Sequence, residues 1–278
     1  MTAILSRPAS PPAPVGELLR HWRQRRRLSQ LDLAGDADVS TRHLSYVETG
    51  RSVPSREMVL RLAERLDVPL RERNRLLTAA GYAPMFGERR LDDPAFAAAR
   101  QAIELVLRGH EPYPALAVDR HWTLVSHNRM LPLLLDGLPA ALMQPPVNVL
   151  RLSLHPQGIA PRIVNLAQWR SHLFARLRQQ IDISGDPVLA ALLEELSAYP
   201  APAETHPAPR ALDTAVAVPL QIASASGTLS FISTTTVFGT PVDITLSELA
   251  LETFFPADEA TAQALRRLGD AVAAGVAA

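Results

Sequence analysis

The first third of the chain repeats apolar residues at helical spacing, in short stretches separated by cap and turn signals. The first stretch predicts a helix over 15–27. Ser29 and Ser40 each fit an N-cap, because a serine hydroxyl accepts hydrogen bonds from backbone N–H groups of the turn that follows. Two further helices are predicted at 55–66 and 70–80. The pattern therefore predicts five short helices, of which the second and third form a helix-turn-helix.

The third predicted helix has two chemically different faces. At 100° per residue, Leu44, Val47 and Glu48 share the face that packs inward. In the second helix, the residues predicted to point inward are Leu31, Leu33 and Ala34. The outward positions of the third helix are Arg42, Ser45, Tyr46 and Thr49, with Thr41 at its start. A guanidinium fork suits guanine, and hydroxyl groups suit base edges or phosphates, so this face fits a DNA major groove.

The remainder of the chain mixes alternating apolar runs with longer amphipathic ones. Strands are predicted at 115–118 and 122–125 as a hairpin, then within 214–223, over 229–237, and from Val242 through Ile244 and Leu246. Pro219 places the third of these at a sheet edge. Helices are predicted at 92–107, 128–135, 162–180 and 187–199. Two strands, helices and three more strands favour an antiparallel α+β domain.

The predicted organisation has four parts. Residues 1–14, with four prolines, are expected to form a disordered arm, and 15–80 the helical DNA-binding domain. A linker is expected at 81–91, where two glycines and a proline follow a helix, and the α+β domain at 92–278. No apolar run is long enough for a membrane span and no signal peptide is recognisable, so a cytoplasmic protein that contacts no membrane is expected.

The composition excludes most enzyme classes that are recognised by short sequence motifs. The 278 residues include no cysteine and no lysine, which excludes thiolate chemistry, Schiff bases and the P-loop lysine. No G-x-G-x-x-G, H-E-x-x-H or G-x-S-x-G occurs. We therefore predict no catalytic residue, no metal site and no cofactor. His127 or His155 acting as a base in a DNA-tethered enzyme is the weakest alternative, because no nucleophile or paired carboxylate accompanies them.

A formal net charge of zero conceals an uneven distribution. Residues 15–90 hold 15 arginines against 10 carboxylates, whereas 91–278 hold 12 arginines against 18 carboxylates. Phosphate contacts supply much of the affinity for DNA, so the basic front part is the expected DNA partner. An ordinary solvated face is the alternative reading of the charge excess alone.

Three segments of the front part resemble one family. The runs S-Q-L-D-L-A at 29–34, V-S-T-R-H-L-S-Y-V-E-T-G-R-S-V-P-S at 39–55 and L-x-L-A-x-x-L-D-V-P at 60–69 resemble the five-helix, lambda-repressor-like domain of XRE-family regulators. The resemblance implies phosphate binding by Gln30, base reading by the outward positions of the third helix, and a structural pair between Arg23 and Glu48. The expected DNA-binding set is Gln30, Ser40, Thr41, Arg42, Ser45, Tyr46 and Arg51.

One position departs from that family. Asp38 stands in the turn where the family usually has glycine, and aspartate tolerates a left-handed backbone better than most residues, so the turn is expected to survive. Gly35 inside the second helix costs about 1 kcal/mol of helix propensity.

The back part resembles, through fewer residues, the PAS-like ligand-binding domain of MmyB-like regulators. The segments that carry the likeness are P-A-L-A-V-D-R-H-W-T-L-V-S-H-N-R at 114–129, N-V-L-R-L at 148–152, N-L-A-Q-W at 165–169 and T-L-S-E-L-A-L-E-T-F-F-P-A-D at 245–258. The resemblance implies a small apolar effector, such as a fatty acid. The family's S-x-x-F-x-x-L-W segment is not recognisable.

Candidate ligand contacts are tryptophans and polar groups near these segments. Arg151 or Arg162 would suit a ligand carboxylate, while core packing is the competing reading for both tryptophans. The candidates are Trp122, His127, Asn128, Arg151, Arg162 and Trp169, with the threonines at 234–236.

The predicted function is a sequence-specific transcription regulator that binds a double-stranded DNA operator as a homodimer and senses a small apolar or carboxylate ligand. A back domain used only for oligomerisation or protein contacts is the alternative.

Overall fold

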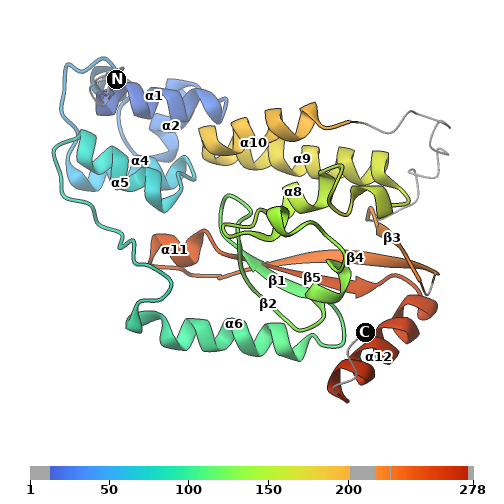
Figure 1. The fold of residues 1–278 in the computed structure, drawn as a ribbon. Coiled ribbons are helices and arrows are strands. Elements are labelled where there is room, and N and C mark those ends of the chain that lie inside the picture. Colours follow the sequence, from blue (N-terminus) through green and yellow to red (C-terminus); the bar gives the residue numbers. More distant parts are fainter. Residues whose placement is uncertain (1–12, 201–216, 226, 275–278) are drawn as a thin grey trace, which may run out of the picture. The chain divides into compact units, whose positions relative to one another are not determined.

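The computed structural model describes residues 13–200, 217–225 and 227–274. These fall into two compact units (Figure 1): one contains the described residues up to Glu88 together with Val242–Ile244, and the other contains the remaining described residues. Most of the predicted arm at 1–14, and the start of the strand predicted within 214–223, lie outside the described residues.

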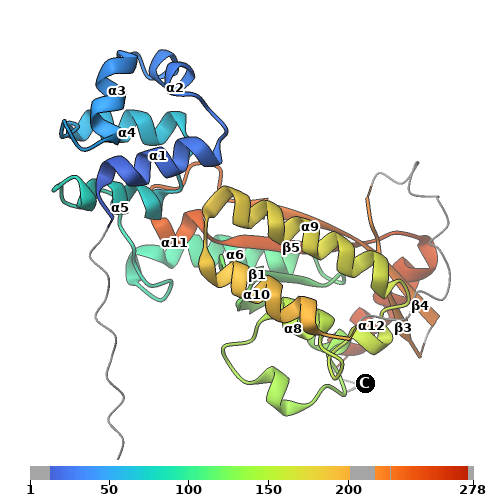
Figure 2. The same cartoon turned by 90° about the horizontal axis from the view of Figure 1, so that it is seen from above.

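The first unit is helical, as the periodicity predicts. Its helices are α1 (Val15–Arg25), α2 (Gln30–Asp36), α3 (Thr41–Glu48), α4 (Arg56–Arg65) and α5 (Leu70–Ala79) (Figure 2). The serine caps are confirmed, because Ser29, Ser40 and Ser55 accept hydrogen bonds from backbone N–H groups three residues on. Ser29 and Asp32 form a complete capping box. The core joins all five helices and contains Leu19, Leu33, Leu44, Leu62 and Leu77 among its buried residues.

The turn between α2 and α3 has the predicted left-handed residue. Asp38 has φ 51°, and the N–H of the next residue, Val39, donates to Ala34 O at 2.9 Å. Leu33 and Ala34 are buried, but the prediction for Leu31 is wrong, since it is 70% exposed. Because α2 has only seven residues, its inward stripe is narrow and the position two residues before Leu33 points to solvent.

Helices α1 and α3 approach so closely that only glycine fits at their contact. A Cβ on Gly16 would overlap the carbonyl oxygen of Val47 and lie 3.0 Å from that of Glu48, whereas a Cβ on Gly35 would meet nothing within 4 Å. We expect Gly16→Ala to lower the free energy of unfolding by about 1–3 kcal/mol, because the helices must separate. Gly35→Ala, the matched control, is expected to raise it by up to about 1 kcal/mol. Urea denaturation of both variants tests the pair, and equal effects would contradict the close approach.

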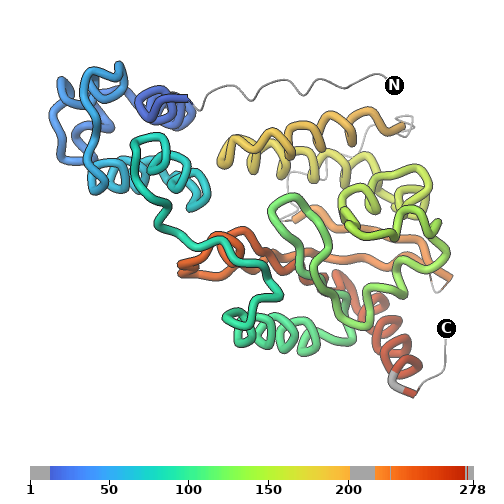
Figure 3. Tube along the Cα trace, turned by 60° about the vertical axis from the view of Figure 1, so that its left-hand side comes forward, coloured from blue at the N-terminus to red at the C-terminus, as the bar shows by residue number. Residues whose placement is uncertain are grey.

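The second unit contains one antiparallel sheet. Its strands are β1 (Ala115–Val118), β2 (Leu124–His127), β3 (Leu220–Ser224), β4 (Gly227–Val237) and β5 (Ala250–Pro256), in the order β2-β1-β5-β4-β3. The last strand in sequence thus lies between β1 and β4, and its red trace can be followed into the sheet in Figure 3. In this register Leu116 lies opposite Glu252, and Glu252 lies opposite Thr235. The α+β class is confirmed, as is the edge position of the strand that follows Pro219.

Helices cover both faces of this sheet. On one face lie α7 (Leu131–Leu134), α8 (Val149–Leu154), α9 (Leu166–Ser184) and α10 (Pro187–Ala198), and their apolar residues form the larger core with the sheet (Figure 1). On the other face, α6 (Ala97–Gly109) packs through Ile103 and Leu107 against β1 and β5. The remaining helices are α11 (Ile244–Ser247) and α12 (Glu259–Ala273). Alternate residues of the central strands therefore face two different helical layers.

Both outer strands bond to segments of the same chain outside the sheet. Beside β3, Val164 N–H donates to Gln221 O at 2.9 Å and Ile163 forms a bridge with Ile222. Beside β2, Leu124 N–H donates to Val147 O at 2.7 Å. Loop backbone thus covers part of each sheet edge.

One predicted strand is wrong and several boundaries move. The segment that begins at Val242 is not a strand, because Ile244 starts the short helix α11 and the strand begins only at Ala250. Strand β5 contains a run of three buried residues, Leu251–Thr253, because a strand in the middle of a sheet is packed on both faces. Such a strand lacks the alternation of apolar and polar residues that marks a half-exposed strand, so the sequence pattern did not reveal it. The second strand starts two residues later than predicted, the helix predicted at 128–135 is reduced to Leu131–Leu134, and α9 runs from Leu166 to Ser184.

Candidate functional site

The exposed face of α3 carries a compact group of hydrogen-bond donors and an aromatic ring. Arg42 is exposed, and Thr41, Ser45 and Tyr46 are half-buried. Arg42 Nε donates to the Tyr46 hydroxyl at 3.0 Å, and its guanidinium carbon lies 5.4 Å from the ring centroid. Arg51, just beyond the helix, places its guanidinium carbon 5.9 Å from the same ring. The predicted outward set of α3 is thus brought together on one surface, with Arg42 and Arg51 both close to Tyr46.

The opposite face of α3 is fixed by a buried carboxylate. Glu48 is 3% exposed and accepts from Arg23 Nε at 2.7 Å, from Arg23 Nη2 at 2.9 Å and from Gln30 Nε2 at 2.8 Å. Burial alone would raise the pKa of Glu48, but the hydrogen bonds from Arg23 and Gln30 outweigh it and lower the pKa. The bond to Glu48 in turn raises the pKa of Arg23. The expected Arg23–Glu48 pair is present, and it sets the angle of α3 against α1.

Two predicted contacts are already engaged within the unit. The amide of Gln30 is bound to Glu48, which holds its side chain at the start of α2. The hydroxyl of Ser40 caps α3 through His43 N–H at 3.1 Å. Each still has a proton to donate, because an amide carries two N–H protons and a hydroxyl oxygen accepts without using its own proton.

A partly open, mainly apolar cavity of about 80 Å³ lies between the sheet and the helices α7–α9 of the second unit. Trp122 and Trp169, two of the predicted contacts, line it and are both at least 95% buried. Their indole N–H groups donate elsewhere, Trp122 to Gln180 Oε1 at 2.8 Å and Trp169 to Ser153 Oγ at 3.0 Å. The cavity is lined by Leu116, Trp122, Leu124, Leu131, Leu134, Leu135, Val149, Leu150, Leu152, Ser153, Ile159, Trp169, Leu173, Arg176, Leu220, Ile222, Ser233, Glu252 and Phe254.

A salt bridge forms the polar end of this cavity. Arg176 of α9 donates from Nη1 to Glu252 Oε2 at 3.0 Å and from Nη2 to Glu252 Oε1 at 2.5 Å. Thr235, opposite Glu252 in the sheet, donates to Oε1 at 2.9 Å and accepts from Arg176 Nη2 at 2.6 Å. The Arg176 guanidinium carbon also lies 4.5 Å from the centroid of the Trp122 ring. The pair is thus held by both the sheet and the cavity wall.

A histidine, His172 of α9, stacks on Trp169 of the cavity wall, with ring centroids 5.4 Å apart. Burial lowers the pKa of His172, and the nearby positive charge of Arg176 lowers it further. His172 itself does not line the cavity, and the lining residues with ionisable side chains are Arg176 and Glu252.

The other predicted ligand contacts lie outside the cavity. Arg151 forms a two-point ion pair with Glu195 at 2.8 and 2.7 Å, and Arg162 donates to the carbonyl of Leu134. Buried Asn128 bonds four backbone groups, those of Leu107, Tyr113, Ala115 and Met130, and so fastens the start of the hairpin. His127 is exposed. The threonines at 234–236 are exposed, and none of them lines the cavity.

Arg176 and Glu252 are the contacts that sequence reasoning missed, although a signal exists. Trp169, Leu173 and Arg176 follow the i, i+4, i+7 spacing of one helical face, and Glu252 alternates with Phe254 in an apolar strand. An ionisable residue on the inward face of a helix and one of opposite charge on the inward face of a strand together indicate a buried ion pair.

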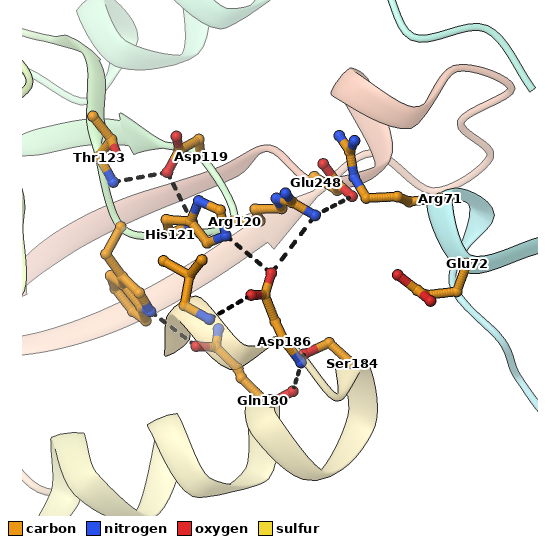
Figure 4. Close-up of polar contacts among 12 residues, drawn as sticks. Arg71, Glu72, Asp119, Arg120, His121, Thr123, Gln180, Ser184, Asp186 and Glu248 are labelled. Carbon is orange, nitrogen blue, oxygen red and sulfur yellow. Dashed lines mark hydrogen bonds and ion pairs between the residues drawn. The ribbon is translucent and has the colours of Figure 1, made fainter. Parts of the chain in front are cut away.

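A second polar cluster surrounds the turn that carries Trp122 (Figure 4). Trp122 has a left-handed φ of 66°, and Asp119 Oδ1 accepts the N–H groups of both its neighbours, His121 and Thr123, at 2.8 Å. Asp186, at the start of α10, accepts from His121 Nε2 at 2.9 Å and lies 3.6 Å from Arg120. Burial would raise the pKa of Asp186, but these partners lower it. The cluster thus fixes the turn on the outer side of the cavity wall.

The two units together define a class of protein. Helix-turn-helix geometry with a donor-rich, outward α3, followed by an α+β unit with an internal cavity, is the architecture of a DNA-binding transcription regulator.

Comparison with known families supports this class and specifies it. A helix-turn-helix domain model matches residues 14–76, and the model of the MmyB-like transcription regulator ligand binding domain matches residues 99–268. The chain belongs to the MmyB-like transcription regulators. A search of curated proteins found no match. None of the helices in the described residues has the length and hydropathy needed to span a bilayer.

Proposed function

We propose that the protein binds a specific double-stranded DNA operator as a homodimer, with α3 of each copy in a major groove. The observation that carries this is the outward group of Arg42, Tyr46 and Arg51 on a helix whose inner face is locked by Glu48. Arginine forks read guanine, and a symmetric dimer would read two half-sites about one helical turn apart. The proposed set of DNA contacts also includes Gln30, Ser40, Thr41 and Ser45.

The cavity supports a second part of the proposal, that a small apolar ligand changes the affinity for the operator. A ligand does so only if it binds two conformations or dimer arrangements of the protein with different affinity. A mainly apolar cavity bordered by Trp122 and Trp169 favours a domain that binds such a ligand over a domain used only for oligomerisation. Equal operator affinity with and without a bound ligand would contradict this part and favour the alternative, a domain for oligomerisation or protein contacts.

Salt dependence tests the DNA-binding part. If the protein neutralises about six phosphates, doubling the salt concentration lowers the operator affinity about fortyfold. The operator is first identified by mapping the DNA that the protein protects across the genome. Fluorescence anisotropy with a labelled copy of this operator then measures how the affinity changes with salt concentration. Affinity that is unchanged as salt rises would remove the phosphate contacts and with them the proposal.

A further inference from the structure

Large apolar side chains are exposed on the face of the sheet against which α6 packs. On α6 itself, Leu105 is 63% and Val106 is 45% exposed. On the sheet, Ile232 is 39% and Phe255 is 44% exposed, and these two residues lie opposite each other on β4 and β5. Single exposed apolar residues are ordinary, whereas a contiguous group of them is typical of an interaction site.

The strand register places the sheet residues on the same face as α6. Leu251 of β5 packs against α6, so Phe255, four residues further along the strand, points to the same side of the sheet. The residues of β4 on this side, Ile232, Thr234 and Thr236, are all exposed. Helix α6 packs over β1 and β5 and leaves this part of β4 uncovered. We call these three residues the β4 strip.

The outer side of α6 has a second uncovered surface. Ala98, Ala102, Leu105 and Gly109 follow helical spacing along the side that faces away from the sheet, and all four are exposed. We call these four residues the outer stripe. A shallow groove of about 90 Å³ lies between α6 and β4, with Val106 in its lining. The outer stripe and the β4 strip therefore lie side by side on one face of the second unit.

This face carries little charge, unlike the remainder of the second part of the chain. Residues 91–278 hold 12 arginines against 18 carboxylates, so two copies repel each other over most of this surface. Residues 229–242, which contain the β4 strip, include no charged residue. Beside the outer stripe, Arg108 and Glu104 form an ion pair with each other at 3.4 Å. Two copies of like charge therefore meet at the lowest electrostatic cost through this face.

We propose that two copies of the chain associate through this face, with the outer stripe of each copy lying on the β4 strip of the other. This inference rests on the proposed homodimer and specifies its interface. A two-fold interface uses the same surface on both copies, so that surface must contain both members of every contact. The stripe and the strip meet this condition, because both are uncovered and both lie on one face. A different partner would need only one of them.

Sedimentation equilibrium of the full chain measures the dissociation constant of the dimer. Leu105→Arg puts a charge on the outer stripe, and Ile232→Glu puts one on the β4 strip. Each charge is hydrated in the monomer and becomes buried without a partner in the dimer. Each variant should therefore raise the dissociation constant at least about thirtyfold.

The matched control introduces the same charge on the opposite side of the sheet. Val188 of α10 is 49% exposed, and α10 belongs to the helical layer that covers the other face. Val188→Arg should leave the dissociation constant unchanged. Circular dichroism checks that all three variants are folded.

A mixture of the two interface variants tests the contact itself. A dimer of one Leu105→Arg chain and one Ile232→Glu chain has one native contact between stripe and strip, and one contact between the introduced guanidinium and the introduced carboxylate. The mixture should dimerise at least about tenfold more tightly than either variant alone, because opposite charges now meet. Two α6 helices that met only each other would gain nothing from mixing.

Each outcome decides a different statement. A native dimer that tolerates both Leu105→Arg and Ile232→Glu, or a mixture no tighter than the single variants, would overturn this interface and leave the homodimer standing. A native chain that stays monomeric at micromolar concentration would overturn both the interface and the homodimer of the proposed function. The salt titration judges DNA binding separately.

Discussion

Replacing Thr41 and Arg42 together by alanine should lower the affinity for the operator at least about a hundredfold. Each good base contact contributes about 1–3 kcal/mol of discrimination, and a dimer loses the Arg42 contact at both half-sites. Affinity for unrelated DNA should fall much less, because phosphate contacts elsewhere on the unit persist. Anisotropy titrations with operator and scrambled duplexes measure both quantities.

The matched control is another exposed arginine of the same unit. Arg75 lies on α5, outside the helix-turn-helix, and pairs with Glu72 of the same helix. Arg75→Ala should leave the ratio of operator to scrambled affinity unchanged. If the Thr41/Arg42 double variant kept that ratio, or kept promoter occupancy in cells, then α3 would not be the element that reads the sequence.

Glu48→Ala should lower the free energy of unfolding of the first unit by about 3–5 kcal/mol. The side chain of Glu48 is fully buried and that of Arg23 is 12% exposed, so removing the carboxylate leaves a confined cation without its anion and frees Gln30. Urea denaturation measures the loss. The double variant Arg23→Met/Glu48→Leu removes both charges and should recover most of it, since the penalty comes from the unpaired charge. A double variant as unstable as the single one would refute this explanation.

The Arg23–Glu48 pair also predicts how the stability of the first unit depends on pH. The folded-state pKa of Glu48 lies below its ordinary value of 4.5, so its stabilisation is fully present above that pH and is lost as the pH falls towards the folded-state pKa. Glu48→Gln lacks a titrating group at this position. The stability difference between the native chain and Glu48→Gln should therefore be constant above about pH 5 and narrow below pH 4.5. A difference that stays constant to pH 3 would contradict the lowered pKa.

Local signals explain why the helical unit was predictable. Its caps, its left-handed Asp38 and its inward Leu44 and Val47 are all set by residues a few positions apart. The prediction that Leu31 is buried was wrong because a seven-residue helix is too short for periodicity to define its buried face. The outward face of α3 follows from helical spacing alone, so the sequence predicts which α3 side chains face away from the core.

The α+β unit was less predictable because its decisive contacts are distant in sequence. Arg176 and Glu252 are 76 residues apart, and only the placement of β5 between β1 and β4 brings them together. The two arginines that sequence reasoning favoured, Arg151 and Arg162, were chosen for their charge, but nearby groups of the chain already satisfy them. Trp122 and Trp169 were predicted as ligand contacts with core packing as the competing reading, and in the structure they both line the cavity and belong to the core.

The covered sheet edges restrict how copies of this chain can associate. An exposed outer strand is a template on which a neighbouring molecule can add a strand, and repeated addition produces fibrils. Here the Val164 N–H already occupies the Gln221 carbonyl on β3, and the Val147 carbonyl already occupies the Leu124 N–H on β2, so a foreign strand would first have to displace the chain's own loops. Self-assembly through a continuous intermolecular sheet is thereby disfavoured, and we expect the proposed homodimer to associate through other surfaces.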